Sequence, residues 1–180
     1  MTDQELEKLR YPIGRFSSAK QLSPEEREEK RSSIRLFPAR LRSAAEGLND
    51  EQLDTPYRPG GWSIRQVIHH VVDSHMNSYV RFRWTLTEDE PVIKAYDEKA
   101  WALLPDAKTA PVSISLDLLH HLHIRWMLLL DSMGEKEYQK RLEHPVSGYL
   151  TLDEMLALYA WHCDHHLAHV TELKAKEGWG

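Results

Sequence analysis

The last long segment of the chain places a core-type side chain at every third or fourth position, which is the spacing of one face of an α-helix. The series is Leu152, Leu156, Tyr159, Cys163, His166, Val170 and Leu173. Thr151 directly precedes this series, and with Glu154 three residues later it forms a capping box. Six unbroken steps of this period predict a long helix whose one face packs against other helices.

Three earlier segments have the same period. They run from the capping box at Ser23 and Glu26, from the capping box at Ser63 and Gln66 to about Glu88, and from about Ser115 to Met133. In the first segment the apolar face is Ile34, Phe37, Leu41, Ala45 and Leu48. Pro38 falls within this face, and because proline lacks a backbone N–H we expect the helix to kink or break there.

Four amphipathic helices predict an all-α four-helix bundle. Residues 90–111 form a long connection between the second and third helices, with a short helical turn expected around Trp101. Residues 135–150 contain Pro145 and Gly148 and predict a turn or a small hairpin. Since 180 residues fit one domain, we expect residues 1–180 to form a single domain.

Composition excludes several classes of partner. The net charge is −5 and the basic residues are scattered, so nucleic acid is not an expected partner. The longest apolar runs fall short of the roughly 18 residues that a membrane span needs, and the start of the chain lacks a signal-peptide pattern. Cys163 is the one cysteine and cannot form an internal disulfide. We therefore expect a cytoplasmic protein without a membrane partner.

The last helix also carries the strongest chemical signal. His162 and His166 are four residues apart, so their side chains lie on one helical face and can bind one metal ion. An imidazole buried without a partner costs about 1–3 kcal/mol. Hydrogen bonding to a backbone carbonyl would satisfy a lone inward histidine, but a pair at this spacing favours metal binding.

The residues leave the third ligand open. His75 lies near the centre of the apolar stripe of the second helix, with His69 and His70 on either side of it, and His123 holds a core position on the third helix. Periodicity alone favours His75. We expect His120 and His121 at the boundary of the core or in solvent, and His144 in a loop. His165 and His169 are expected either to contact the metal ligands without binding the metal or to be exposed.

Several motifs spread over nearly the whole chain resemble a known family. They are Tyr11–Gly14, Leu53–Arg58, Gly60–His70, Asp73–Tyr79, Tyr96–Trp101 and Trp161–His162. In these motifs the chain resembles the DinB-like metalloproteins, most closely their YfiT-type branch of metal-dependent hydrolases. The resemblance implies a metal held by His70, His162 and His166, against the choice of His75 that periodicity favours. It also implies a cytoplasmic homodimer.

Three neutral imidazoles with an open fourth position are typical of a catalytic metal site. We expect one divalent ion per chain, zinc first and nickel second, because imidazole suits both. The expected function is hydrolysis of a small molecule by metal-bound water. The first alternative is transfer of a thiol such as bacillithiol to an electrophile through a metal-bound thiolate, as in a sibling branch of the family. The second is a non-catalytic interaction domain that the metal stabilises.

No side chain can be assigned as the catalytic group from the sequence. Asp73 and Asp164 are candidates for orienting an imidazole. Tyr79, His75 and His123 are candidates for lining the open side of the metal. We expect Cys163 to be a small core residue and Trp62 to close the start of the second helix.

Overall fold

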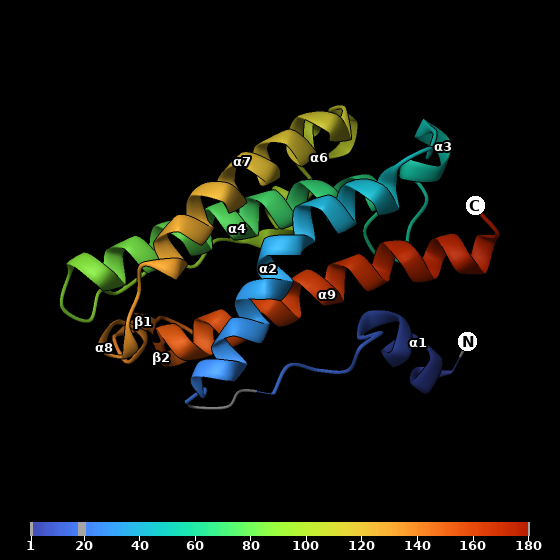
Figure 1. Ribbon diagram of the computed structural model, residues 1–180. Helices are drawn as coiled ribbons and strands as arrows, with labels where there is room; N and C mark the ends of the chain where they lie inside the picture. Colours follow the sequence, from blue (N-terminus) through green and yellow to red (C-terminus); the bar gives the residue numbers. More distant parts are fainter. Residues whose placement is uncertain (1, 18–20, 180) are drawn as a thin grey trace.

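Four long helices dominate the computed structural model, which describes residues 2–17 and 21–179. They are α2 (Pro24–Ala45), α4 (Ile64–Thr87), α7 (Val112–Asp131) and α9 (Leu152–Glu177). Both α2 and α4 pack against α7 and α9, so the four helices enclose one core (Figure 1). The predicted all-α four-helix bundle is confirmed.

Shorter elements connect the long helices. They are α1 (Asp3–Arg10), α3 (Asp50–Leu53), α5 (Glu98–Trp101), α6 (Pro105–Thr109), α8 (Glu135–Tyr138), β1 (Arg141–His144) and β2 (Gly148–Thr151). The two strands form an antiparallel hairpin, and α5 is the helical turn expected around Trp101. His144, expected in a loop, instead ends β1. The sequence patterns did not predict α1.

Three of the long helices begin where the capping boxes place them. The side chains of Ser23, Ser63 and Thr151 each accept a hydrogen bond from the backbone three residues later. The fourth helix, α7, begins at Val112, three residues before the expected start at Ser115. Its N-cap residue is Pro111, which has no side-chain acceptor, so no capping box marks this start in the sequence.

Helix α2 runs unbroken through Pro38, so of the two expected outcomes, a kink or a break, the break does not occur. The axis of α2 changes direction along its length, as a kink requires (Figure 1). Pro38 is buried, and the helix packs against α7 and α9 along this region. The loss of one backbone donor is therefore tolerated, because tertiary packing holds the helix on both sides of the proline.

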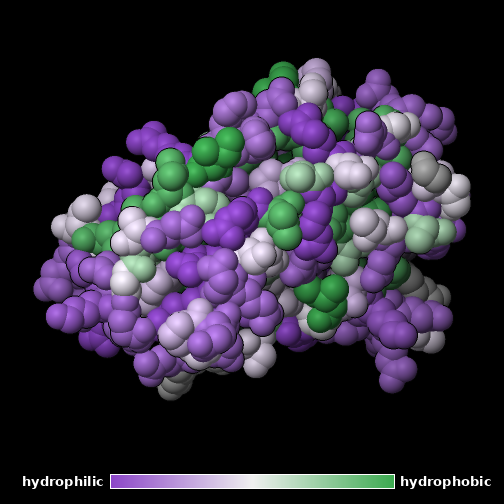
Figure 2. All heavy atoms as spheres, in the orientation of Figure 1, coloured by the Kyte–Doolittle hydropathy of each residue, from purple (hydrophilic) through white to green (hydrophobic). Residues whose placement is uncertain are grey.

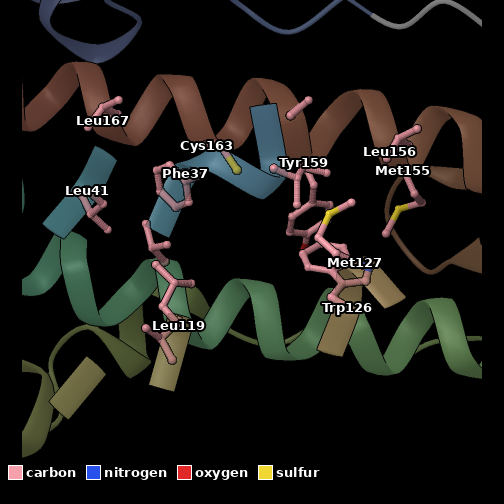
Figure 3. Packing of buried hydrophobic residues seen from close by; sticks show 14 of the residues in the cluster. Phe37, Leu41, Leu119, Trp126, Met127, Met155, Leu156, Tyr159, Cys163 and Leu167 are labelled. Atoms are coloured by element: carbon pink, nitrogen blue, oxygen red, sulfur yellow. The ribbon is translucent and has the colours of Figure 1, made fainter. Parts of the chain in front are cut away.

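The core lies between the long helices at the positions that the periodicity predicts. Figure 3 shows Phe37 and Leu41 of α2, Leu119 of α7 and Cys163 of α9 pointing into the space that the helices share. All four side chains are fully buried. Cys163 is therefore a core residue, as expected.

A buried ion pair fixes the start of α9 to α2. Both oxygens of Asp153 accept hydrogen bonds from the guanidinium of Arg27 at 2.7 Å, and Asp153 is completely buried. The backbone N–H of Leu22 and the amide of Gln139 also donate to this carboxylate, at 3.3 and 3.1 Å. The ion pair thus anchors the helix that carries His162 and His166. Across the described residues, no helix is long and apolar enough to cross a membrane.

Candidate metal centre

His70 of α4 and His162 and His166 of α9 come together where the two helices pack. One ring nitrogen from each lies within 4.8 Å of those of the other two. The ring centroids are 4.4 Å apart for His162 and His166, and His70 lies 5.5 and 4.9 Å from them. The three residues, which we call the candidate metal centre, are those that the family resemblance implied.

The imidazoles of the candidate metal centre are held in the neutral form. His70 and His166 are buried, and His162 is partly buried. Burial lowers the pKa of His70 to about 4 and lowers the pKa of His162 and His166 well below the usual value. Neighbouring imidazoles add to this effect in each case. Each ring therefore keeps a lone pair at neutral pH, which is what a metal ligand requires.

The donor set fits a divalent metal. Imidazole nitrogens bind zinc at about 2.0–2.1 Å, so a tetrahedral ion holds them about 3.3 Å apart. Nitrogens already within 4.8 Å need only small side-chain movements to reach that spacing. Among the residues that the structure describes, no carboxylate or thiol completes this group of three.

The three imidazoles border a cavity of about 560 Å³. Aromatic side chains form much of its wall, and they are Tyr11, Tyr57, Trp62 and Trp161. Arg10, Arg58 and Lys99 add positive charge, and Glu98 is the one carboxylate among the lining residues. One side of the candidate metal centre therefore faces a space large enough for a small molecule.

The rival third ligands lie elsewhere. His69 points toward α7, with Nδ1 2.7 Å from the Ser115 hydroxyl and Nε2 3.2 Å from the Ala110 carbonyl. His75 lies behind His162, with Nε2 3.1 Å from Nδ1 of that ring. The choice of His75 by periodicity therefore does not match the group that converges. His75, His123 and Tyr79 are not among the residues that line the cavity, so that expectation is wrong.

The remaining histidines divide into buried and exposed groups. His120 and His121 are exposed, as expected, whereas His165 and His169 are buried beside His166. The three buried rings form a second group of nitrogens within 4.8 Å of one another. The ring of His165 stacks on Trp161 at 4.3 Å between centroids, and its Nδ1 has no hydrogen-bond partner among the described residues.

Neither candidate carboxylate orients an imidazole in the described part of the chain. Asp164 accepts hydrogen bonds from Arg40 at 2.7 Å and from Ser33 at 3.1 Å, both on α2. Asp73 is half-buried, and burial together with Asp106 raises its pKa to about 6. The groups that hydrogen-bond to His162 and His166 in the described residues are other imidazoles.

The N-terminal segment contributes to the site in a way that the sequence patterns missed. Arg10 and Tyr11 line the cavity, and the Arg10 carbonyl lies 3.2 Å from Nε2 of His169. The indole N–H of Trp161 donates to the Gly14 carbonyl at 3.2 Å. Only the family resemblance, which included Tyr11–Gly14, pointed to this segment.

Comparisons with known proteins identify relatives of this chain. Residues 34–170 match the family model described as the DinB superfamily. The chain is 48% identical over 172 residues to "Putative metal-dependent hydrolase YfiT" of Bacillus subtilis, covering 95% of this chain and 97% of that protein. A Bacillus licheniformis protein whose name likewise calls it a metal-dependent hydrolase is 46% identical over 175 residues, covering 97% of this chain and 99% of its own.

Solved structures show the same fold. The structure of YfiT from Bacillus subtilis, described as a probable metal-dependent hydrolase with an unusual four-helix bundle topology, superposes with a TM-score of 0.94. It is 47% identical and covers 96% of this chain and 99% of its own. A mycothiol-dependent maleylpyruvate isomerase has a TM-score of 0.65 at 14% identity, covering 80% of this chain and 60% of its own, and shares the fold.

Proposed function

This chain belongs to the DinB superfamily, and from that membership we propose that it is a metal-dependent hydrolase of small molecules. His70, His162 and His166 are its proposed ligands, for one divalent ion per chain. Zinc is the first choice and nickel the second, because neutral imidazole suits both metals.

One observation supports the proposal above all others. Three neutral imidazole nitrogens lie within 4.8 Å of one another and face a cavity of about 560 Å³. A structural zinc site is normally closed by four protein ligands, whereas a catalytic site combines three ligands with an open position. The cavity gives a substrate access to that position.

A divalent metal in such a site polarises a substrate oxygen and acidifies water. The side chains around it have separate roles. Arg10, Arg58 and Lys99 favour a substrate or product that carries negative charge near the cavity wall. Glu98 carries the one carboxylate among the described lining residues, and a carboxylate can accept a proton during the reaction. The rings of Trp62 and Trp161 exclude water and offer flat apolar surfaces to a substrate.

Elemental analysis of the purified protein and of three alanine variants tests the ligand set. We expect about one metal per wild-type chain and loss of stoichiometric metal in His70→Ala, His162→Ala and His166→Ala. His121→Ala is the matched control, because this histidine is exposed and lies on α7 away from the cavity. Full metal content in the His162 and His166 variants would refute the assignment.

A substrate panel tests the reaction. The metal-loaded protein is assayed against ester, amide and phosphoester substrates, and separately with bacillithiol and a chlorinated acceptor. Hydrolysis that disappears in the His166→Ala variant supports the proposal. Conjugation of the thiol without any hydrolysis would replace it with thiol transfer. A melting temperature that falls on chelation, with no turnover of any substrate, would leave only a metal-stabilised interaction domain.

We also propose that the protein is a homodimer. The support for this proposal is a set of four large apolar side chains on α7 that are 45–71% exposed. They are Ile114, Leu118, Ile124 and Leu128. Figure 2 shows hydrophobic side chains gathered over this helix, at the upper left of the molecule. Large apolar side chains that are exposed together on one helix often mark an interface between proteins.

A further inference from the structure

Each α9 ligand of the candidate metal centre begins a chain of hydrogen-bonded imidazoles that ends on a backbone carbonyl. In the first chain, Nδ1 of His162 lies 3.1 Å from Nε2 of His75. Nδ1 of His75 then lies 2.7 Å from Nε2 of His123, whose own Nδ1 lies 2.8 Å from the Ile34 carbonyl oxygen. We call His162, His75 and His123 the first imidazole chain.

The second imidazole chain, His166 and His169, is shorter. The Nδ1 atoms of the two rings are 3.3 Å apart. Nε2 of His169 lies 3.2 Å from the carbonyl oxygen of Arg10. The first chain therefore ends on α2 and the second on α1.

The terminal carbonyl fixes the direction of every hydrogen bond in the first chain. A carbonyl oxygen can only accept, so Nδ1 of His123 carries its proton and donates to Ile34. In a neutral ring the other nitrogen is then an acceptor, so Nε2 of His123 accepts from Nδ1 of His75. By the same step Nε2 of His75 accepts from Nδ1 of His162. The lone pair of His162 is left on Nε2.

The second chain leads to the same result. Nε2 of His169 donates to the Arg10 carbonyl, so Nδ1 of His169 is the acceptor. The proton between the two rings therefore belongs to Nδ1 of His166, and the lone pair of His166 is also on Nε2. His75, His123 and His169 are buried, and no carboxylate among the described residues is hydrogen-bonded to them, so each ring is held neutral.

We infer that His75, His123 and His169 are positioning residues that hold the protons of His162 and His166 on Nδ1 and so direct Nε2 of both ligands toward the metal. This inference rests on the proposed metal site. Which nitrogen of a ligand histidine binds a metal is set by the hydrogen bond that the other nitrogen makes. Both chains end on neutral carbonyls, so within the described residues no carboxylate is connected to His162 or His166 through them, and a divalent ion bound there would not have its charge reduced by an anionic partner of these two ligands.

A second metal at His165, His166 and His169 is the competing interpretation of the same rings. A metal bound through the Nδ1 atoms of His166 and His169, which are 3.3 Å apart, would need a lone pair on both, whereas the inference places a proton on the Nδ1 atom of His166. Two metal ions per chain, one of them lost in His169→Leu, would therefore overturn the inference for the second chain.

Nitrogen-15 NMR of the histidine side chains tests the inference directly in the full-length wild-type protein, both metal-free and zinc-loaded. We expect His162 and His166 to be protonated on Nδ1 in both states, with zinc changing the Nε2 resonances. Protonation on Nε2 of either residue in the metal-free protein would overturn the inference. This measurement needs no variant, so it does not depend on whether a substitution disturbs folding.

Zinc affinity, measured by competition with a chromophoric chelator, tests the positioning role. Loss of a group that hydrogen-bonds to a metal ligand typically weakens metal binding about 10- to 100-fold, and this is the change that we expect for His75→Leu and His169→Leu. We expect His75→Gln and His169→Asn to bind within about 3-fold of wild type, because a side-chain amide oxygen can accept the same Nδ1–H. His69→Leu is the control, since His69 is buried beside His70 but belongs to neither chain.

The outcomes separate this inference from the proposed function. Unchanged affinity in both leucine variants, with metal lost in His162→Ala, would refute the positioning role and leave the metal site intact. Unchanged metal content in His162→Ala would refute the site itself. Leucine and amide variants that lose affinity equally would show that packing, rather than the accepted hydrogen bond, is what matters.

Discussion

Lowering the pH from 7 to 5 is expected to unfold the metal-free protein, because its buried imidazoles are neutral in the fold and take up protons once exposed. Burial lowers the pKa of His70, His123 and His165 to about 4 and the pKa of His169 to about 3. In the unfolded chain each titrates near 6.5. The unfolded state therefore binds more protons below pH 6.5, and the free energy of unfolding decreases as the pH falls toward the folded-state values.

The size of the effect follows from these pKa differences. One pKa unit corresponds to about 1.4 kcal/mol, so each of the four rings removes about 2 kcal/mol of stability by pH 5. Together they remove about 8 kcal/mol, against a total stability of about 5–15 kcal/mol for a typical domain. The pKa values of His75, His162 and His166 are also lowered by burial, and their contributions have the same sign. The unfolding midpoint is expected between about pH 5 and 6.

Urea unfolding of chelator-treated protein, followed by tryptophan fluorescence at several pH values from 7 to 5, measures this loss. The free energy of unfolding should fall steeply, by about 5 kcal/mol per pH unit near pH 5.5 if the four rings titrate independently. His123→Gln removes one ring that takes up a proton on unfolding, so it should lower that slope by about 1.4 kcal/mol per pH unit. His121→Gln should leave the slope unchanged because His121 is exposed. A free energy that stays flat between pH 7 and 5 would refute the claim that the buried rings are neutral.

Three further predictions concern the surrounding fold. Asp153→Ala removes one of the two carboxylates that pair with the buried Arg27, the other being Glu135, and should lower the free energy of unfolding by about 1.5–3 kcal/mol in chemical denaturation; a loss below 1 kcal/mol would contradict this. Cys163 is fully buried, and burial raises the pKa of its thiol, so Ellman's reagent should label it only in denaturant; rapid labelling of the native protein would contradict its core position. Leu128→Glu places a charge on the exposed face of α7 and should convert the proposed dimer to a monomer in light scattering, an outcome that an unchanged mass would exclude.

The fold was largely predictable because local signals agreed with one another. The capping boxes at Ser63 and Thr151 begin the two helices that carry the ligands, and the three- and four-residue steps mark their buried faces. The pairing of His162 with His166 follows from helix geometry alone, since residues four apart share a face whatever the helix packs against. These features needed no knowledge of tertiary structure.

The third ligand was not predictable from periodicity because α4 is buried on more than one side. It packs against α7 and against α9, so His69, His70 and His75 are all buried and no single stripe distinguishes them. His69 faces α7, whereas His70 faces α9. That division depends on how α4 is rotated between its neighbours, which only long-range contacts determine.

The same packing explains why so many of the eleven histidines are inside the protein. One chain of hydrogen bonds runs from the Ile34 carbonyl on α2 through His123 on α7 and His75 on α4 to His162. A second chain runs from the Arg10 carbonyl next to the cavity through His169 to His166. His75, His123 and His169 each cost stability in acid, yet each also fixes the position of the proton on the next ring of its chain. Part of the acid sensitivity and the orientation of the two α9 ligands therefore depend on the same three rings, so replacing one of these rings with leucine should lower both the acid sensitivity and the zinc affinity.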